Sequence, residues 1–106
     1  MNIKTLASFL NRNSIPYETR TIHHDYFTIL SPAAPAVAYS IITVELITPD
    51  IHKLNADHQK IEKYCSRYNF NIYNRGRLSC DIYGNYHYFM AIRTQEAAEA
   101  GRHAMK

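Results

Sequence analysis

The chain has 106 residues, with 12 Lys and Arg against 9 Asp and Glu, which gives a formal net charge of +3. Apolar residues make up 46% and only three residues are glycine, a composition that excludes disordered and collagen-like classes. The length predicts a single domain spanning residues 1–106. The longest apolar run, residues 35–47, is too short and too interrupted to cross a membrane, and the N-terminus lacks a signal-peptide pattern. We therefore expect a cytoplasmic protein with no membrane partner.

The first third of the chain predicts one helix and two short strands. Apolar side chains recur at helical spacing over residues 2–13, and Pro16 prevents that helix from continuing. Strands are expected at residues 15–20 and 26–30, separated by a turn at residues 21–25. The two prolines within residues 31–35 then predict a loop.

The centre of the chain predicts a strong strand followed by a long helix. Residues 36–47 are rich in β-branched side chains and apolar on both parities, which is typical of a strand covered on both faces or paired on both edges. Over residues 48–68 apolar side chains recur every three or four positions, so one helical face should be buried; they are Ile51, Leu54, Ile61, Tyr64, Cys65 and Tyr68. We expect Thr48 to cap this helix and Pro49 to occupy its first position.

The last third predicts a three-stranded meander and a final helix. Strands are expected at residues 70–74, 77–83 and 86–93, and residues 94–106 have high helix propensity. In the middle strand the alternation places Leu78, Cys80 and Ile82 toward the core. The element order is α-β-β-β-α-β-β-β-α. It defines an α+β fold in which an antiparallel sheet packs against a long central helix, with short N- and C-terminal helices.

The other face of the meander is the best candidate for a binding surface. It should carry aromatic side chains interleaved with basic ones, namely Tyr73, Arg75, Arg77, Tyr83, His87, Phe89 and Arg93. Such a face can stack bases and neutralise phosphates when it is open to water. If a terminal helix covers it, the same aromatic residues are ordinary packing.

Two sets of residues are candidates for a metal or catalytic site. His23, His24 and Asp25 could combine with another histidine, but adjacent strand side chains point to opposite faces, and His52 and His58 are six residues apart. We therefore interpret these as turn and surface histidines. A nuclease-like set of Glu45, Asp50 and Lys53 has no recognised spacing, and Asp50 already suits the start of the long helix, so this set is the weaker alternative.

Nucleophile and cofactor motifs are missing from the sequence. Cys65 lies on the apolar helix face and Cys80 on the apolar strand parity, so both are predicted to be reduced, buried and inert. Neither a GxSxG motif nor a glycine-rich phosphate loop occurs. We expect no catalytic residue, no metal and no cofactor.

The leading hypothesis is therefore a small non-catalytic interaction module. It would be an accessory or inhibitor protein that binds a larger protein or a second copy of itself, as a homodimer. A nucleic-acid-binding module that holds single-stranded RNA or DNA on the meander face is the first alternative. A small metal-dependent nuclease or hydrolase is the second alternative.

Overall fold

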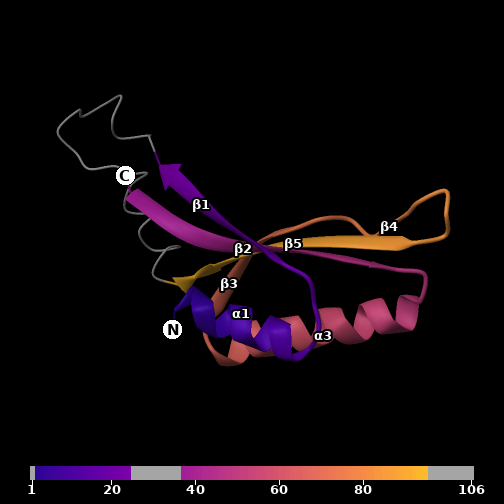
Figure 1. The fold of residues 1–106 in the computed structure, drawn as a ribbon, viewed down its shortest axis with the longest axis horizontal. Coiled ribbons are helices and arrows are strands. Elements are labelled where there is room, and N and C mark those ends of the chain that lie inside the picture. Colours follow the sequence, from indigo (N-terminus) through magenta and orange to yellow (C-terminus); the bar gives the residue numbers. More distant parts are fainter. Residues whose placement is uncertain (1, 25–36, 96–106) are drawn as a thin grey trace.

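The computed structural model describes residues 2–24 and 37–95, which form an antiparallel sheet with helices on one side (Figure 1). The elements are α1 (Ile3–Arg12), β1 (Glu18–His24), β2 (Val37–Thr48), α3 (Ile51–Arg67), β3 (Phe70–Arg75), β4 (Ser79–Cys80) and β5 (Tyr86–Thr94). The predicted α+β class with an antiparallel sheet is confirmed. The described part contains two helices; the strand predicted at 26–30, the loop at 31–35 and nearly all of the predicted C-terminal helix lie outside it.

The sheet has the strand order β1-β2-β5-β3, and β4 also pairs with β5. The long strand β2 is central because its first half pairs with β1 and its second half with β5. Cross-strand neighbours such as Ile42 with Ile92 and Val44 with Met90 put apolar side chains on the helix side of the sheet. Apolar side chains occur on both faces of β2 because this strand lies in the middle of the sheet. Ile41 on one face and Ile42 on the other are both buried.

The long helix α3 buries the predicted face. Leu54, Ile61 and Cys65 are buried against the sheet, and Leu6 and Leu10 of α1 join the same core. The two helices are connected through aromatic contacts, which include the stacked rings of Phe9 and Tyr64 at 4.0 Å. The core therefore lies between one face of the sheet and both helices.

The start of α3 differs from the prediction. Asp50, not Thr48, is the N-cap: its carboxylate accepts hydrogen bonds from the backbone N–H groups of His52 at 3.0 Å and Lys53 at 3.3 Å. Thr48 instead accepts a hydrogen bond from the N–H of Asp50, and Pro49 precedes the helix. An aspartate at this position satisfies two otherwise unpaired amides and places a negative charge at the positive end of the helix dipole.

The turn predicted at residues 21–25 is also wrong over its described part. β1 continues to His24, because residues 21–24 pair in unbroken register with residues 40–37 of β2. Long-range pairing with a strongly β-forming partner outweighs the local turn preference of this polar segment.

The predicted three-stranded meander is a two-stranded hairpin with irregularities. β3 and β4 both pair with β5, one after the other, and the turn lies at residues 81–85. The register shifts between Ile72 and Asn74, and the backbone N–H of Gly76 donates to the carbonyl of Phe89 at 2.8 Å between the two short strands. Bulges of this kind break the two-residue alternation of side chains.

The burial predicted for the apolar side chains of the middle strand is wrong, although Cys80 pairs with Tyr86 on the helix side of the sheet. Leu78 and Cys80 are exposed, and Ile82 lies in the turn rather than in a strand. None of the three belongs to the core that holds Met90 and Ile92. The correction matters for function, because it moves apolar side chains from the interior to the surface.

Candidate binding surface

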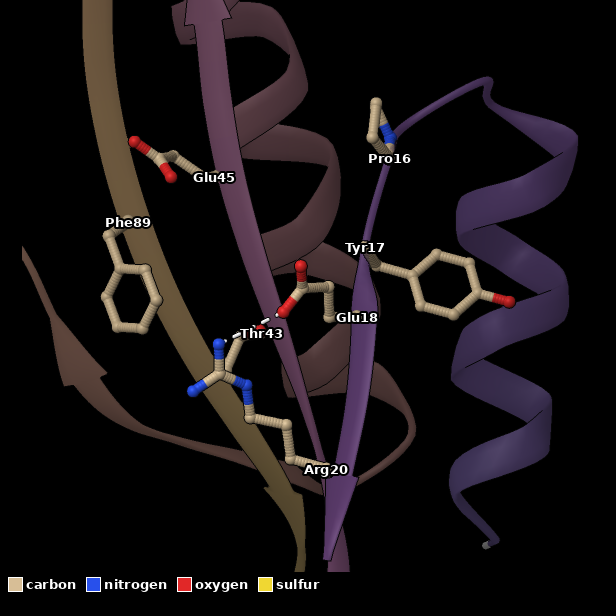
Figure 2. Close-up of a pocket in the computed structure, with 7 residues that line it drawn as sticks. All are labelled: Pro16, Tyr17, Glu18, Arg20, Thr43, Glu45 and Phe89. Atoms are coloured by element: carbon tan, nitrogen blue, oxygen red, sulfur yellow. Dashed lines mark hydrogen bonds and ion pairs between the residues drawn. The ribbon is translucent and has the colours of Figure 1, made fainter.

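The face of the sheet opposite the two described helices is the setting of the candidate site. Glu45 of β2 and Phe89 of β5 lie directly opposite each other in the register and point to this side (Figure 2). With Arg20 and Thr43 they line a shallow depression of about 330 Å³, which Pro16, Tyr17 and Glu18 complete. We call this side the open face, because α1 and α3 both pack on the other side (Figure 1).

Four of the seven predicted binding residues share the open face. His87 and Phe89 are half-buried there, and Arg93 follows them at the same parity of β5. The guanidinium of Arg93 lies 4.6 Å from the centroid of the Tyr73 ring and donates a hydrogen bond to Asn71 at 2.9 Å. The strand β5, which has no register shift against β2, thus presents the predicted mixture of aromatic and basic groups.

The other three predicted residues lie elsewhere. Tyr83 is exposed in the turn, and Arg77 is exposed between β3 and β4. Arg75 is on the helix side, where it donates two hydrogen bonds to the carboxylate of Glu62 on α3, at 2.9 and 3.1 Å. Its predicted place on the binding face is therefore wrong, because the register shift in β3 turns it to the other side.

The Arg75–Glu62 pair has a structural role. Glu62 also contacts Nε2 of His58 at 3.1 Å, and the His58 ring lies 4.6 Å from that of Tyr88 on β5. Arg75, followed by His58, lowers the pKa of Glu62, so this carboxylate stays ionised. The cluster links α3 to β3, and the guanidinium of Arg75 is already paired with the carboxylate of Glu62.

The turn at residues 81–85 is held by a single aspartate. Oδ1 of Asp81 accepts hydrogen bonds from the backbone N–H groups of Tyr83 at 2.8 Å and Asn85 at 3.0 Å. The N–H of Asp81 donates to the carbonyl of Asn85, and Gly84 has a φ of 83°, a region that favours glycine. The turn therefore has a defined shape, and this shape presents Ile82 and Tyr83 to solvent.

His87 connects this turn to the sheet. Its Nε2 lies 2.8 Å from Oδ2 of Asp81, and its Nδ1 lies 3.3 Å from Oε1 of Glu45. The hydrogen bond with Asp81, and then that with Glu45, raises the pKa of His87 above its usual value. The same contact with His87 is the largest cause that lowers the pKa of Asp81.

Sequence reasoning missed this arrangement. It placed His87 and Glu45 in separate sets and did not select Asp81. One signal was present: an aspartate four residues before Asn85 and three before Gly84 is typical of a turn closed by an aspartate side chain. The pairing of β2 with β5, which brings Glu45 to His87, is a long-range contact that the spacing of residues does not reveal.

The structure does not bring the predicted nuclease-like set together. Asp50 caps α3, and Lys53 is paired with Asp57 at 3.7 Å on the same helix. Glu45 faces His87, both of whose ring nitrogens are directed at carboxylates, so this histidine presents no free nitrogen to a substrate. Within residues 2–24 and 37–95, no group of three or more His, Cys, Asp and Glu side chains has the geometry to hold a metal ion.

The remaining candidates are separated as well. His23 and His24 end β1, while His52 is exposed on α3. Cys65 is buried as predicted, and burial raises the pKa of its thiol to about 12. Cys80 is exposed, so the prediction of a second buried thiol is wrong.

No protein family, no curated protein and no solved structure matches this chain in the comparisons. None of the helices in the described part is long and apolar enough to span a membrane.

Proposed function

We propose that this chain is a small interaction module that binds another protein through the 81–85 turn and the adjoining open face. The observation that carries the proposal is the exposure of two neighbouring large side chains: Ile82 is 92% exposed and Tyr83 is 82% exposed. Both are displayed by a turn that Asp81 holds in one shape. Apolar and aromatic side chains presented on a preorganised element lose little entropy on binding and are typical anchors of protein interfaces.

Other exposed apolar side chains lie on the same hairpin. Leu78 is 50% exposed and Tyr73 is 36% exposed, and both belong to the segment that pairs with β5. Ile47, 54% exposed, lies opposite His87 in the register of β2. Single exposed apolar residues are ordinary, but four on one hairpin, with Ile47 on the adjoining strand β2, support a contact surface.

The charges of the open face also favour a protein partner. Carboxylates of Glu18, Glu45 and Asp81 stand beside the cationic groups, and the Arg20 guanidinium is 3.0 Å from Glu18. A nucleic-acid site gains most of its affinity from cations that neutralise phosphates. On a face of mixed charge, the carboxylates offset this gain in affinity for phosphates. Alternating charges suit the polar rim of a protein interface.

The test is a double variant, I82S/Y83S, compared with K60S/K63S, which changes two exposed residues of α3. A partner recovered with the native chain after nuclease treatment is titrated against all three proteins. We expect the turn variant to weaken binding by about 30-fold or more, because losing a hot-spot side chain costs about 2 kcal/mol or more. The α3 variant should bind like the native chain, and circular dichroism should show both variants folded. Equal binding by the folded turn variant would contradict the proposal.

Self-association is tested with the same proteins. If the partner is a second copy of the chain, sedimentation equilibrium should show a native dimer that the turn variant converts to monomer. A protein that acts as an accessory or inhibitor would instead be a monomer that saturates a larger partner at a fixed ratio.

Nucleic-acid binding remains the second candidate because of one contact, the Arg93 guanidinium over the Tyr73 ring. An exposed ring beside an arginine can stack a base and contact its phosphate. This alternative expects a labelled single-stranded oligonucleotide to bind with strong salt dependence and to lose affinity in Y73A/R93A. No binding at low salt would remove it.

A further inference from the structure

His87 connects three segments of the chain, which are its own strand β5, the 81–85 turn and β2. It belongs to β5, its Nε2 faces Asp81 of the turn at 2.8 Å, and its Nδ1 faces Glu45 of β2 at 3.3 Å. The other oxygen of Asp81 holds the backbone of Tyr83 and Asn85. A continuous set of hydrogen bonds therefore runs from β2 through His87 into the turn that displays Ile82 and Tyr83.

The protonation state of the ring decides how many of these bonds exist. An imidazolium has two N–H groups and can donate to both carboxylates, whereas a neutral imidazole has one. A neutral ring must therefore direct a lone pair at one of the two carboxylates. Because the contact with Asp81 is shorter, the neutral ring should keep it and lose the contact with Glu45.

The surroundings of His87 favour the imidazolium. In the described part, the charged groups in contact with the ring are the two carboxylates. Its register neighbours are uncharged: Ser79 on β4 and Ile47 on β2. The cations that share a depression with Glu45 are already paired, Arg20 with Glu18 and Lys53 with Asp57. Both described helices pack on the opposite side of the sheet.

We propose that His87 is a proton-dependent bridge between β2 and the 81–85 turn, and that it makes the presentation of Ile82 and Tyr83 sensitive to pH. The protonated ring fixes the turn to the sheet through both carboxylates. Loss of the proton opens the Glu45 contact and leaves the turn attached to β5 alone. The regulatory meaning of this bridge rests on the proposed function, because it concerns the same turn; the bridge itself is a property of the free chain.

The test is a pH titration of the free, isotope-labelled protein by NMR between about pH 5 and pH 9, a range that spans the usual pKa of histidine. We expect the His87 ring, the Glu45 side chain and the backbone amides of Tyr83 and Asn85 to shift with one shared midpoint. That midpoint should lie above the usual pKa of a histidine side chain, because both carboxylates favour the charged ring. In H87Q the shifts of Glu45, Tyr83 and Asn85 should disappear, because glutamine does not titrate in this range.

The matched control is H58Q. His58 also contacts a carboxylate, that of Glu62 at 3.1 Å, but on the helix side of the sheet. H58Q should leave the titration of Tyr83 and Asn85 unchanged. The proposal is overturned if those amides still titrate in H87Q, or if their midpoint differs from that of the His87 ring.

The two proposals can fail separately. If the bridge titrates as expected but I82S/Y83S binds the partner like the native chain, the interaction site is wrong and the bridge stands. If the turn variant loses binding but the amides do not follow His87, the binding site stands and its control by pH is wrong.

Discussion

At the scale of single residues, Asp81 does two separate tasks with its two carboxylate oxygens. One oxygen closes the turn, and the other contacts His87. An asparagine in its place retains an acceptor for the turn amides but carries no charge. The two tasks can therefore be separated by substitution.

The D81N variant should lower the pKa of His87 by more than the E45Q variant does. The contact with Asp81 is the largest cause of the raised pKa and is shorter, 2.8 Å against 3.3 Å for Glu45. The midpoint of the His87 titration in each variant is measured from the NMR shifts of the His87 ring carbons as pH is varied. A larger effect of E45Q would contradict the assignment of Asp81 as the main partner.

The contacts of His87 with Asp81 and Glu45 should also make the free energy of unfolding depend on pH. The pKa of His87 is raised in the folded chain, so its contribution is present below the unfolded-state pKa and is lost as pH rises through the folded one. The pKa of Asp81 is lowered, so its contribution is present above the unfolded-state pKa and is lost as pH falls through the folded one. Urea unfolding at several pH values should show that H87Q loses the slope due to His87 and keeps part of the slope due to Asp81, because the backbone N–H groups of Asn85 and Tyr83 also lower the pKa of Asp81.

The two cysteines should react differently with a thiol reagent. Cys80 is exposed, whereas Cys65 is buried and has a pKa raised to about 12. The nucleophile is the thiolate, so a disulfide reagent at pH 8 should modify one thiol per folded chain quickly and the second only after denaturation. The C80S variant should lack the fast step; a fast step that persists in C80S would place Cys65 in solvent.

At the scale of elements, the long helix shows what local chemistry can establish. Its buried stripe was predictable because helical spacing repeats along one continuous segment. Its cap was predicted two residues too early, since Thr48 and Asp50 are both good caps and the choice depends on which carboxylate or hydroxyl reaches the first amides.

Replacement of Asp50 by alanine should destabilise the fold by about 1 kcal/mol, the usual cost of removing an N-cap. The D50S variant should restore most of this loss, because serine is also a good cap. E18A is the control: it removes an ion pair whose side chains are 64% and 70% exposed, and such pairs contribute about 0–1 kcal/mol. Chemical unfolding measures all three, and a D50A loss no larger than that of E18A would contradict the cap.

The hairpin of residues 70–94 shows where local chemistry is insufficient. On β5 the side chains alternate regularly, with Met90 and Ile92 in the core and His87 and Phe89 on the other side, because its pairing with β2 has no register shift. The alternation failed on β3, where a register shift places Arg75 on the helix side of the sheet, and Leu78, which was expected in the core, is exposed. A shift of this kind depends on pairing with β5 and has no clear signature in the segment itself.

At the scale of the whole molecule, the decisive feature is that the described helices share one side of the sheet (Figure 1). The sequence predicted which helical faces are apolar but not the side on which each helix packs. This is why the candidate surface could be named in part, through Tyr73, His87, Phe89 and Arg93, while its link to the turn could not. That link needs three segments brought together by tertiary pairing.

The same one-sided arrangement separates the apolar residues that stabilise the fold from those that we propose contact a partner. Ile61 is fully buried between helix and sheet, whereas Ile82 is 92% exposed in the turn. I61A should therefore lose about 2–5 kcal/mol of unfolding free energy, through lost burial and the cavity left behind. I82A, the same substitution, should change it by no more than about 0.5 kcal/mol. Urea unfolding measures both variants under the same conditions. A change in the unfolding midpoint reports a change in the free energy of unfolding when the dependence of that free energy on urea concentration is the same. A loss in I82A that approaches that in I61A would show that Ile82 is part of the core, and the turn would no longer be available to a partner.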